Sequence, residues 1–184
     1  MPGRGGRLNQ GLGPHLSARG FDVYGREITA NPDRSQSSDF ARLPFDQQIE
    51  VVAHDLTTLV TPENPWVIGN SFGAYLIAHA LLQTPHFTGR CLFLSPVLGP
   101  CHAGGMYFRP PKAGQLEKAI ERGAFLNTKV DIVAGSLDAQ SPVTLCEHMA
   151  RNAQGSLKVI EGEGPRIDPV QVELARSSRN DKRL

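Results

Sequence analysis

Short, mainly apolar runs alternate with amphipathic segments along most of the chain. Such runs are typical of strands that are buried on both faces of a sheet, and the segments between them have helical periodicity. The predicted strands are Phe21–Ile28, Trp66–Gly69, Cys91–Ser95, Val130–Ala134 and Leu157–Ile160. The pattern therefore predicts an α/β fold whose mostly parallel central sheet has about five strands and carries helices on both faces.

Helical segments are expected before and between these strands. They cover roughly Arg7–Arg19, 46–60, Phe72–Gln83, Gln115–Arg122, Pro142–Asn152 and Pro169–Ser178, with Asp46 as the cap of the second. The polar stretch Thr29–Leu43 and the glycine- and proline-rich stretch Leu98–Gly114 contain many residues that break helices and strands. Both stretches are therefore predicted to be irregular.

Composition places the chain among soluble single-domain proteins. It has 184 residues, 40% of them hydrophobic, and a net charge of +1 from 19 basic and 18 acidic side chains. This balance provides no large positive field, so neither a nucleic acid nor a membrane is expected as a partner. One domain over residues 1–184 is predicted, with 177–184 as a flexible basic tail.

The cysteines and the first residues bear on the cellular compartment. Cys91, Cys101 and Cys146 are odd in number and form no CxxC pair, which favours free thiols in a reducing environment. The first residues contain no apolar run of the kind that a signal peptide requires. A cytoplasmic protein is therefore expected, and no motif in the chain predicts a metal site or a cofactor.

One motif carries chemistry. Gly69-Asn70-Ser71-Phe72-Gly73 fits the pattern Gly-x-Ser-x-Gly and stands between a predicted strand and a predicted helix. The chain must turn sharply there, and Gly69 and Gly73 leave free the space that a β-carbon would occupy. Ser71 is therefore predicted to project from the strand end as a nucleophile, with the backbone amide of Phe72 as a donor to an oxyanion.

In this context the motif resembles the nucleophile turn of the α/β-hydrolase superfamily, and the resemblance extends over nearly the whole chain. In that family an acidic residue follows a later strand, and Val130–Pro142 is similar to that strand and turn, with Asp138 at the matching position. The resemblance implies a serine hydrolase that acts on a small-molecule substrate. Taken alone, Asp138 is more typical of a turn residue that caps the helix beginning at Pro142.

The family's base, a histidine after the last strand, has no counterpart in this sequence. Pro165 stands at the matching position, Arg166 follows it, and no histidine occurs after His148. Neither proline nor a permanently protonated arginine can accept the hydroxyl proton of Ser71. His102, in the irregular stretch after the third predicted strand, is the candidate for a substitute base, and Cys101 beside it is a weaker one.

The other histidines have ordinary interpretations. His54, His79 and His148 lie in predicted helices, where a partly exposed or hydrogen-bonded imidazole is usual. His15 and His86 are expected at the surface.

The N-terminal residues also differ from the family. Met1–Gly6 resembles the family's oxyanion loop, with Gly5 as a backbone donor, although a glycine-rich terminus is more often flexible. In the family a central strand precedes this loop and lies between the strands that here are Phe21–Ile28 and Trp66–Gly69. We therefore expect a natural start upstream of Met1, direct pairing of those two strands, or a strand borrowed from another chain such as a second copy.

Two functions of different classes remain open. The resemblance favours a hydrolase that acts on a small ester, thioester or amide through Ser71, with Asp138 in support and with activity reduced by the missing base. The alternative is a non-catalytic binding protein that keeps the fold but has lost the base. A Rossmann-type nucleotide binder is not favoured, because Gly3-x-Gly5-Gly6 does not fit its glycine pattern and no strand precedes it.

Overall fold

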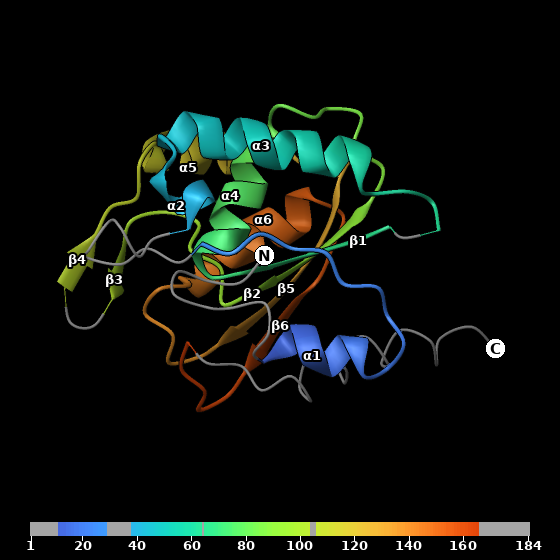
Figure 1. Cartoon of the computed structure of the whole chain (residues 1–184). Helices are drawn as coiled ribbons and strands as arrows, with labels where there is room; N and C mark the ends of the chain where they lie inside the picture. Colours follow the sequence, from blue (N-terminus) through green and yellow to red (C-terminus); the bar gives the residue numbers. More distant parts are fainter. Residues whose placement is uncertain (1–10, 29–37, 64, 104–105, 166–184) are drawn as a thin grey trace.

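The computed structural model describes residues 11–28, 38–63, 65–103 and 106–165, and these form a parallel sheet with helices on both faces (Figure 1). The sheet has four strands, all parallel to their neighbours. In spatial order they are β1 (Trp66–Asn70), β2 (Arg90–Leu94), β5 (Lys129–Gly135) and β6 (Leu157–Ile160). The predicted fold class is confirmed, and the four predicted runs between Trp66 and Ile160 are strands.

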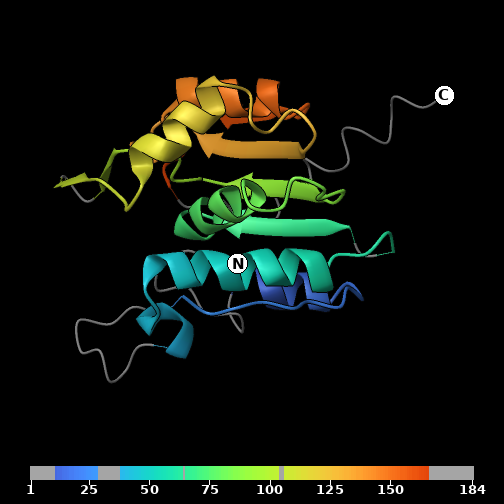
Figure 2. The same cartoon turned by 90° about the horizontal axis from the view of Figure 1, so that it is seen from above.

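The helices cover the two faces unequally. Helix α1 (Leu12–Ser17) lies on one face, and the other carries α3 (Phe45–Thr58), α4 (Phe72–Leu81), α5 (Ala113–Glu121) and α6 (Val143–Asn152) (Figure 1). Seen from above, α3 flanks the sheet beside β1, and α4 lies over the neighbouring strands (Figure 2). Helix α4 is buried on every side, because it is enclosed between the sheet and α3.

Two apolar cores follow from the alternation of side chains along each strand. In β2, Cys91 and Phe93 face the larger core beneath α3 to α6, whereas Leu92 and Leu94 face the smaller one. The smaller core also contains Leu12 of α1. Successive side chains of a strand point to opposite faces, so a wholly apolar strand needs cover on both sides.

The prediction of a strand at Phe21–Ile28 is wrong. This segment contains no strand, and it does not pair with β1 among the described residues. Its apolar side chains do not share a buried face: Phe21, Val23 and Tyr24 are 46%, 41% and 70% exposed. The segment is bound instead to the helices, since Arg26 forms an ion pair with Asp55 of α3. The sheet therefore has one strand fewer than expected, and direct pairing of this segment with β1 does not occur.

Three smaller predictions need correction. The stretch Leu98–Gly114 contains an antiparallel hairpin of β3 (Cys101–Ala103) and β4 (Met106–Phe108), which projects from the body of the fold (Figure 1). The stretch Thr29–Leu43 includes the short helix α2 (Asp39–Arg42), which Ser38 caps. Pro44, not Asp46, precedes the first residue of α3. The expected helix at Pro169–Ser178 and the tail at 177–184 lie outside the described residues.

Cys91, Cys101 and Cys146 are free and buried, as their number and spacing predicted. Within the described ranges, no helix is both long enough and apolar enough to cross a membrane.

Candidate active site

Ser71 lies in a strained turn between β1 and α4. Its backbone has φ 51° and ψ −117°, a combination that residues with a β-carbon rarely adopt. Holding a residue in such a region costs on the order of 1–3 kcal/mol and persists where the surrounding structure determines it. The sharp strand-to-helix turn that the motif requires is therefore present, and the half-buried side chain of Ser71 stands at the carboxyl end of β1.

The glycine at position 69 is required by close packing within this turn. A β-carbon at Gly69 would lie 2.6 Å from Cα of Ala74 and 2.8 Å from its backbone nitrogen. Real β-carbons do not approach backbone atoms this closely, so α4 packs against β1 because Gly69 has no side chain. Gly73 is buried in the first turn of α4.

Backbone hydrogen bonds attach the Ser71 turn, residues 70–72, to the chain that follows β2. The amide of Ser71 donates to the carbonyl of Leu94 at 2.9 Å. The carbonyl of Ser71 accepts from the amides of Tyr75 and Val97, each at 3.3 Å. The segment Ser95–Val97, which we call the linking segment, therefore helps to determine the position of Ser71.

Of the two backbone amides predicted to bind an oxyanion, the structure describes that of Phe72 and not that of Gly5. Phe72 is the first residue of α4, directly after Ser71, and the first turn of this helix carries no acidic side chain. A helix N-terminus without a carboxylate is favourable for a negative charge. Gly5 lies outside the described residues.

Asp138 is buried in the turn after β5, and both of its carboxylate oxygens accept hydrogen bonds. The side chain is 5% exposed, Oδ1 accepts from the amide of Gln140 at 2.9 Å, and Oδ2 accepts from the hydroxyl of Ser141 at 2.9 Å. We call residues 136–141 the acid turn. The hydroxyl of Ser141 also lies 2.9 Å from the carbonyl oxygen of Pro96 in the linking segment. The structure thus joins the acid turn and the Ser71 turn through the same segment.

Two thiols lie close enough to Asp138 to respond to its charge. Burial raises the pKa of Cys101, and the negative charge of Asp138 raises it further. Burial, the charge of Asp138 and the charge of Glu147, in this order, raise the pKa of Cys146 to about 12. Both thiols therefore remain protonated near neutral pH, and Cys101 is a poor nucleophile or base.

The loop after β6 packs directly on the acid turn. The amide of Ser136 donates to the carbonyl of Ile160 at 3.0 Å, and the amide of Leu137 donates to that of Glu163 at 2.9 Å. A β-carbon at Gly135 would overlap the carbonyl oxygen of Glu163. The loop that holds exposed Pro165 thus adjoins Asp138, but proline contributes no titratable group there.

His102 lies next to the acid turn without reaching its carboxylate. The amide of His102 donates to the carbonyl of Ala139 at 3.3 Å, and the exposed imidazole stands edge-on to Tyr107, with ring centroids 5.7 Å apart. Among the described residues, no hydrogen bond joins this imidazole to Ser71 or Asp138. His54, His86 and His148 are exposed, and Nδ1 of His15 lies 3.1 Å from Nη1 of Arg19.

His79 differs from its expected environment, because it is neither exposed nor fully hydrogen-bonded. It is 5% exposed, and Nε2 has no hydrogen-bond partner among the described residues. Its ring stands edge-on to Tyr75 and Phe45, at centroid distances of 4.7 and 5.4 Å. Burial lowers the pKa of His79 to about 4, nearby Lys112 lowers it further, and Asp46 opposes the shift. The apolar residues on both sides of His79 in α4 are the sequence signal that could have predicted this burial.

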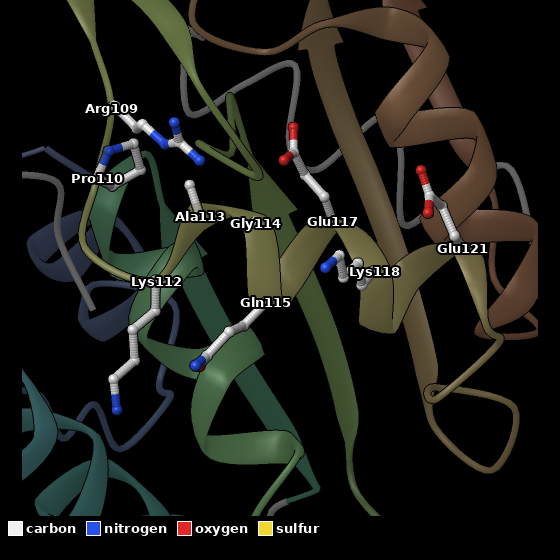
Figure 3. A pocket seen from close by; sticks show the side chains of 9 residues that line it. All are labelled: Arg109, Pro110, Lys112, Ala113, Gly114, Gln115, Glu117, Lys118 and Glu121. Carbon is white, nitrogen blue, oxygen red and sulfur yellow. The ribbon is translucent and has the colours of Figure 1, made fainter.

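A surface pocket of about 540 Å³ lies at the start of α5 (Figure 3). The charged ends of Arg109 and Glu117 lie on one side of the helix, whereas Lys112 extends from the other side (Figure 3). The hydroxyl of Tyr75 donates to the carbonyl of Pro111 at 2.6 Å, which attaches this region to α4. The residues that line the pocket include neither Ser71 nor Asp138.

Comparisons with known proteins support the fold. A protein of Pectobacterium atrosepticum described as a YdeN-like hydrolase is 16% identical, with a TM-score of 0.61, over 97% of this chain and 86% of that one. The monoacylglycerol lipase of Paleococcus ferrophilus is 12% identical, with a TM-score of 0.54, over 74% of each chain. An uncharacterized protein of Bacillus cereus has a TM-score of 0.65 at 12% identity over 100% of this chain, which spans 57% of its length.

These structures show the fold of the chain, which is the α/β-hydrolase fold. No protein-family model matches the sequence. A search of curated proteins finds no similar sequence. At identities of 12% and 16%, the likeness to solved structures shows the fold alone.

Proposed function

We propose that the protein is a serine hydrolase that acts slowly on a small ester, thioester or amide through Ser71. The observation that carries this proposal is the backbone of Ser71, which is held at φ 51° and ψ −117° at the end of a strand. A strained conformation of this kind, with a hydroxyl at a strand end and a helix N-terminus beside it, is typical of a nucleophile elbow.

In the proposed reaction, Oγ of Ser71 attacks the carbonyl carbon of the substrate. The carbonyl oxygen gains the negative charge, and the amide of Phe72 stabilises it from the N-terminus of α4. The bond to the leaving group then breaks, and the leaving alcohol, thiol or amine takes up the proton that the serine hydroxyl loses. Water subsequently releases the acid from Ser71 by the same route.

The proposed rate is low because none of the described residues places a base at Ser71. Pro165 stands where the family's histidine would be, and both oxygens of Asp138 already accept hydrogen bonds from the acid turn. The loss of the base of a triad reduces the rate by about 10⁴- to 10⁶-fold. The hydrolysis of activated substrates, whose leaving groups need no protonation, is therefore the appropriate activity to measure.

The same observations favour a second function, a binding protein on a hydrolase fold that no longer catalyses. Hydrolysis of p-nitrophenyl acetate separates the two. The proposed hydrolase releases p-nitrophenol above the buffer rate, and Ser71→Ala abolishes this excess. A rate that is equal in the unaltered protein and in Ser71→Ala would favour the binding protein.

A further inference from the structure

The hydroxyl of Ser141 is shared between the acid turn and the linking segment. It lies 2.9 Å from Oδ2 of Asp138 and 2.9 Å from the carbonyl oxygen of Pro96. A hydroxyl has one hydrogen to donate, so the two acceptors share it or receive it in turn. Ser141 and Pro96 are 45 positions apart in the chain, and the contact between them is therefore tertiary.

Burial makes Ser141 hard to replace in this role. Ser141 is 0% exposed and Asp138 is 5% exposed, so bulk water has little access to either side chain. Without the hydroxyl, one oxygen of a buried carboxylate and one buried carbonyl would lose their common donor. Hydrogen bonds to a charged acceptor are about twice as strong as neutral ones, so this loss weakens the contact between the two segments.

The linking segment transmits this contact to Ser71. Pro96 lies between Ser95, whose amide donates to the carbonyl of Val133 at 2.8 Å, and Val97, whose amide donates to the carbonyl of Ser71 at 3.3 Å. Ser95 also has a positive φ of 42°, so the segment is bent rather than extended. A displacement of Pro96 therefore displaces the amide that holds the Ser71 carbonyl.

We propose that Ser141 is a positioning residue for Ser71, which it fixes by binding Asp138 and Pro96 together. In this arrangement the shared hydrogen bond of Ser141 is a brace between the acid turn and the linking segment, and Asp138 is one of its two acceptors instead of the partner of a base. This inference deepens the proposed function and rests on it, because Ser71 is positioned for a reaction only if it is the nucleophile. The brace itself is a property of the fold that can be measured without any activity.

The test measures two properties of the full chain with Ser141→Ala and a matched variant. The first is the amide hydrogen exchange of Val97, read by NMR beside the amides of β2 and β5. The second is the rate at which a fluorophosphonate probe labels Ser71. Ser136→Ala is the control, because its hydroxyl lies in the same acid turn, accepts from the amide of Gly162 at 2.9 Å and does not bind Pro96. Ser141→Cys keeps the buried shape with a weaker donor.

We expect Ser141→Ala to exchange the Val97 amide about tenfold faster, with the β2 and β5 amides unchanged, and to lower the labelling rate of Ser71 about fivefold. Ser141→Cys gives a smaller change in both, and it replaces Ser141→Ala as the test variant if the latter does not fold. Equal Val97 exchange in the unaltered protein and the Ser141 variant, or equal acceleration in Ser136→Ala, overturns the inference. Absence of labelling in the unaltered protein would refute the proposed function alone, since the exchange of Val97 still reports on the brace.

Discussion

The amide of Val97 donates a hydrogen bond to the carbonyl of Ser71 across 3.3 Å, which joins the chain after β2 to the turn after β1. Neighbouring parallel strands end at the same edge of a sheet, so residues distant in sequence meet there. Because the hydroxyl of Ser141 binds Pro96, the turn after β5 meets the same segment. The strained backbone of Ser71 is thus supported by the segment that follows β2 and, through that segment, by the turn that follows β5.

The close packing at Gly69 leads to the first testable expectation. Gly69→Ala places a β-carbon 2.6 Å from Cα of Ala74, so α4 or β1 must shift. We expect the free energy of unfolding in urea to fall by about 3 kcal/mol or more, with weaker labelling of Ser71. Gly164→Ala is the control, since a β-carbon there meets nothing within 4 Å. Equal stability of the two variants would show that the turn has room for a side chain.

The environment of His79 leads to an expectation about pH. Its pKa is lowered from 6.5 to about 4 in the folded protein, so the unfolded chain binds the proton more tightly. The stability that this neutral imidazole contributes is fully present above about pH 6.5 and is lost as the pH falls toward about 4. We expect the free energy of unfolding to decrease by about 2 kcal/mol between pH 8 and pH 5 from this group alone.

The variant His79→Phe isolates the contribution of this imidazole to the pH dependence. Phenylalanine keeps an aromatic ring between Phe45 and Tyr75 and has no proton to bind. The charged groups near His79, Lys112 and Asp46, remain in the variant. We expect the loss of stability between pH 8 and pH 5 to be smaller in His79→Phe. Urea titrations that give the same pH slope for both proteins would contradict the assigned burial.

The position of Pro165 leads to a gain-of-function expectation. The loop after β6 adjoins the acid turn through the bond from Leu137 to Glu163, so a side chain at position 165 starts near Asp138. Pro165→His therefore offers an imidazole, and we expect hydrolysis of p-nitrophenyl acetate to rise about tenfold. Pro165→Ala controls for the loss of proline. A rate for Pro165→His no higher than for Pro165→Ala would place position 165 out of reach of Ser71.

The bond between Ser141 and Asp138 leads to an expectation of coupling. Ser141→Ala, Asp138→Ala and the double variant form a cycle whose free energies of unfolding are measured in urea. Since the hydroxyl donates to a buried carboxylate, we expect a coupling energy of about 1–3 kcal/mol. The same cycle for Ser136 and Asp138 should give a value near zero. Additive effects of Ser141→Ala and Asp138→Ala would mean that the two side chains do not act together.

The four mainly apolar strands and the Ser71 turn could be predicted because each is encoded locally. An apolar run followed by a helical period fits a strand covered on both faces, and Gly69 and Ser71 have the spacing that a sharp turn requires. Phe21–Ile28 also contains Asp22, Arg26 and Glu27, and it is not a strand, because it pairs with no neighbour among the described residues. Its described contacts, such as that of Arg26 with Asp55, lead to α3 instead.

The parts of the site that could not be predicted are tertiary. The carboxylate of Asp138 follows a strand, as the resemblance implied, but the sequence does not show that Gln140 and Ser141 occupy its oxygens. Nor does it place Ser141 beside Pro96, 45 residues away. The apolar residues beside His79 in α4 indicate its burial, but its ring contact with Phe45 of α3 depends on how the two helices pack.

Labelling of the full chain with a fluorophosphonate probe, read by intact mass and by the mass of the peptide that contains Ser71, tests the central claim most directly. An activated serine reacts with this probe, and an ordinary serine does not. We expect slow labelling at a single position, Ser71, which Ser71→Ala removes while Ser95→Ala leaves it in place. An unlabelled protein, or a label that persists in Ser71→Ala, would contradict the assignment of Ser71 as the nucleophile.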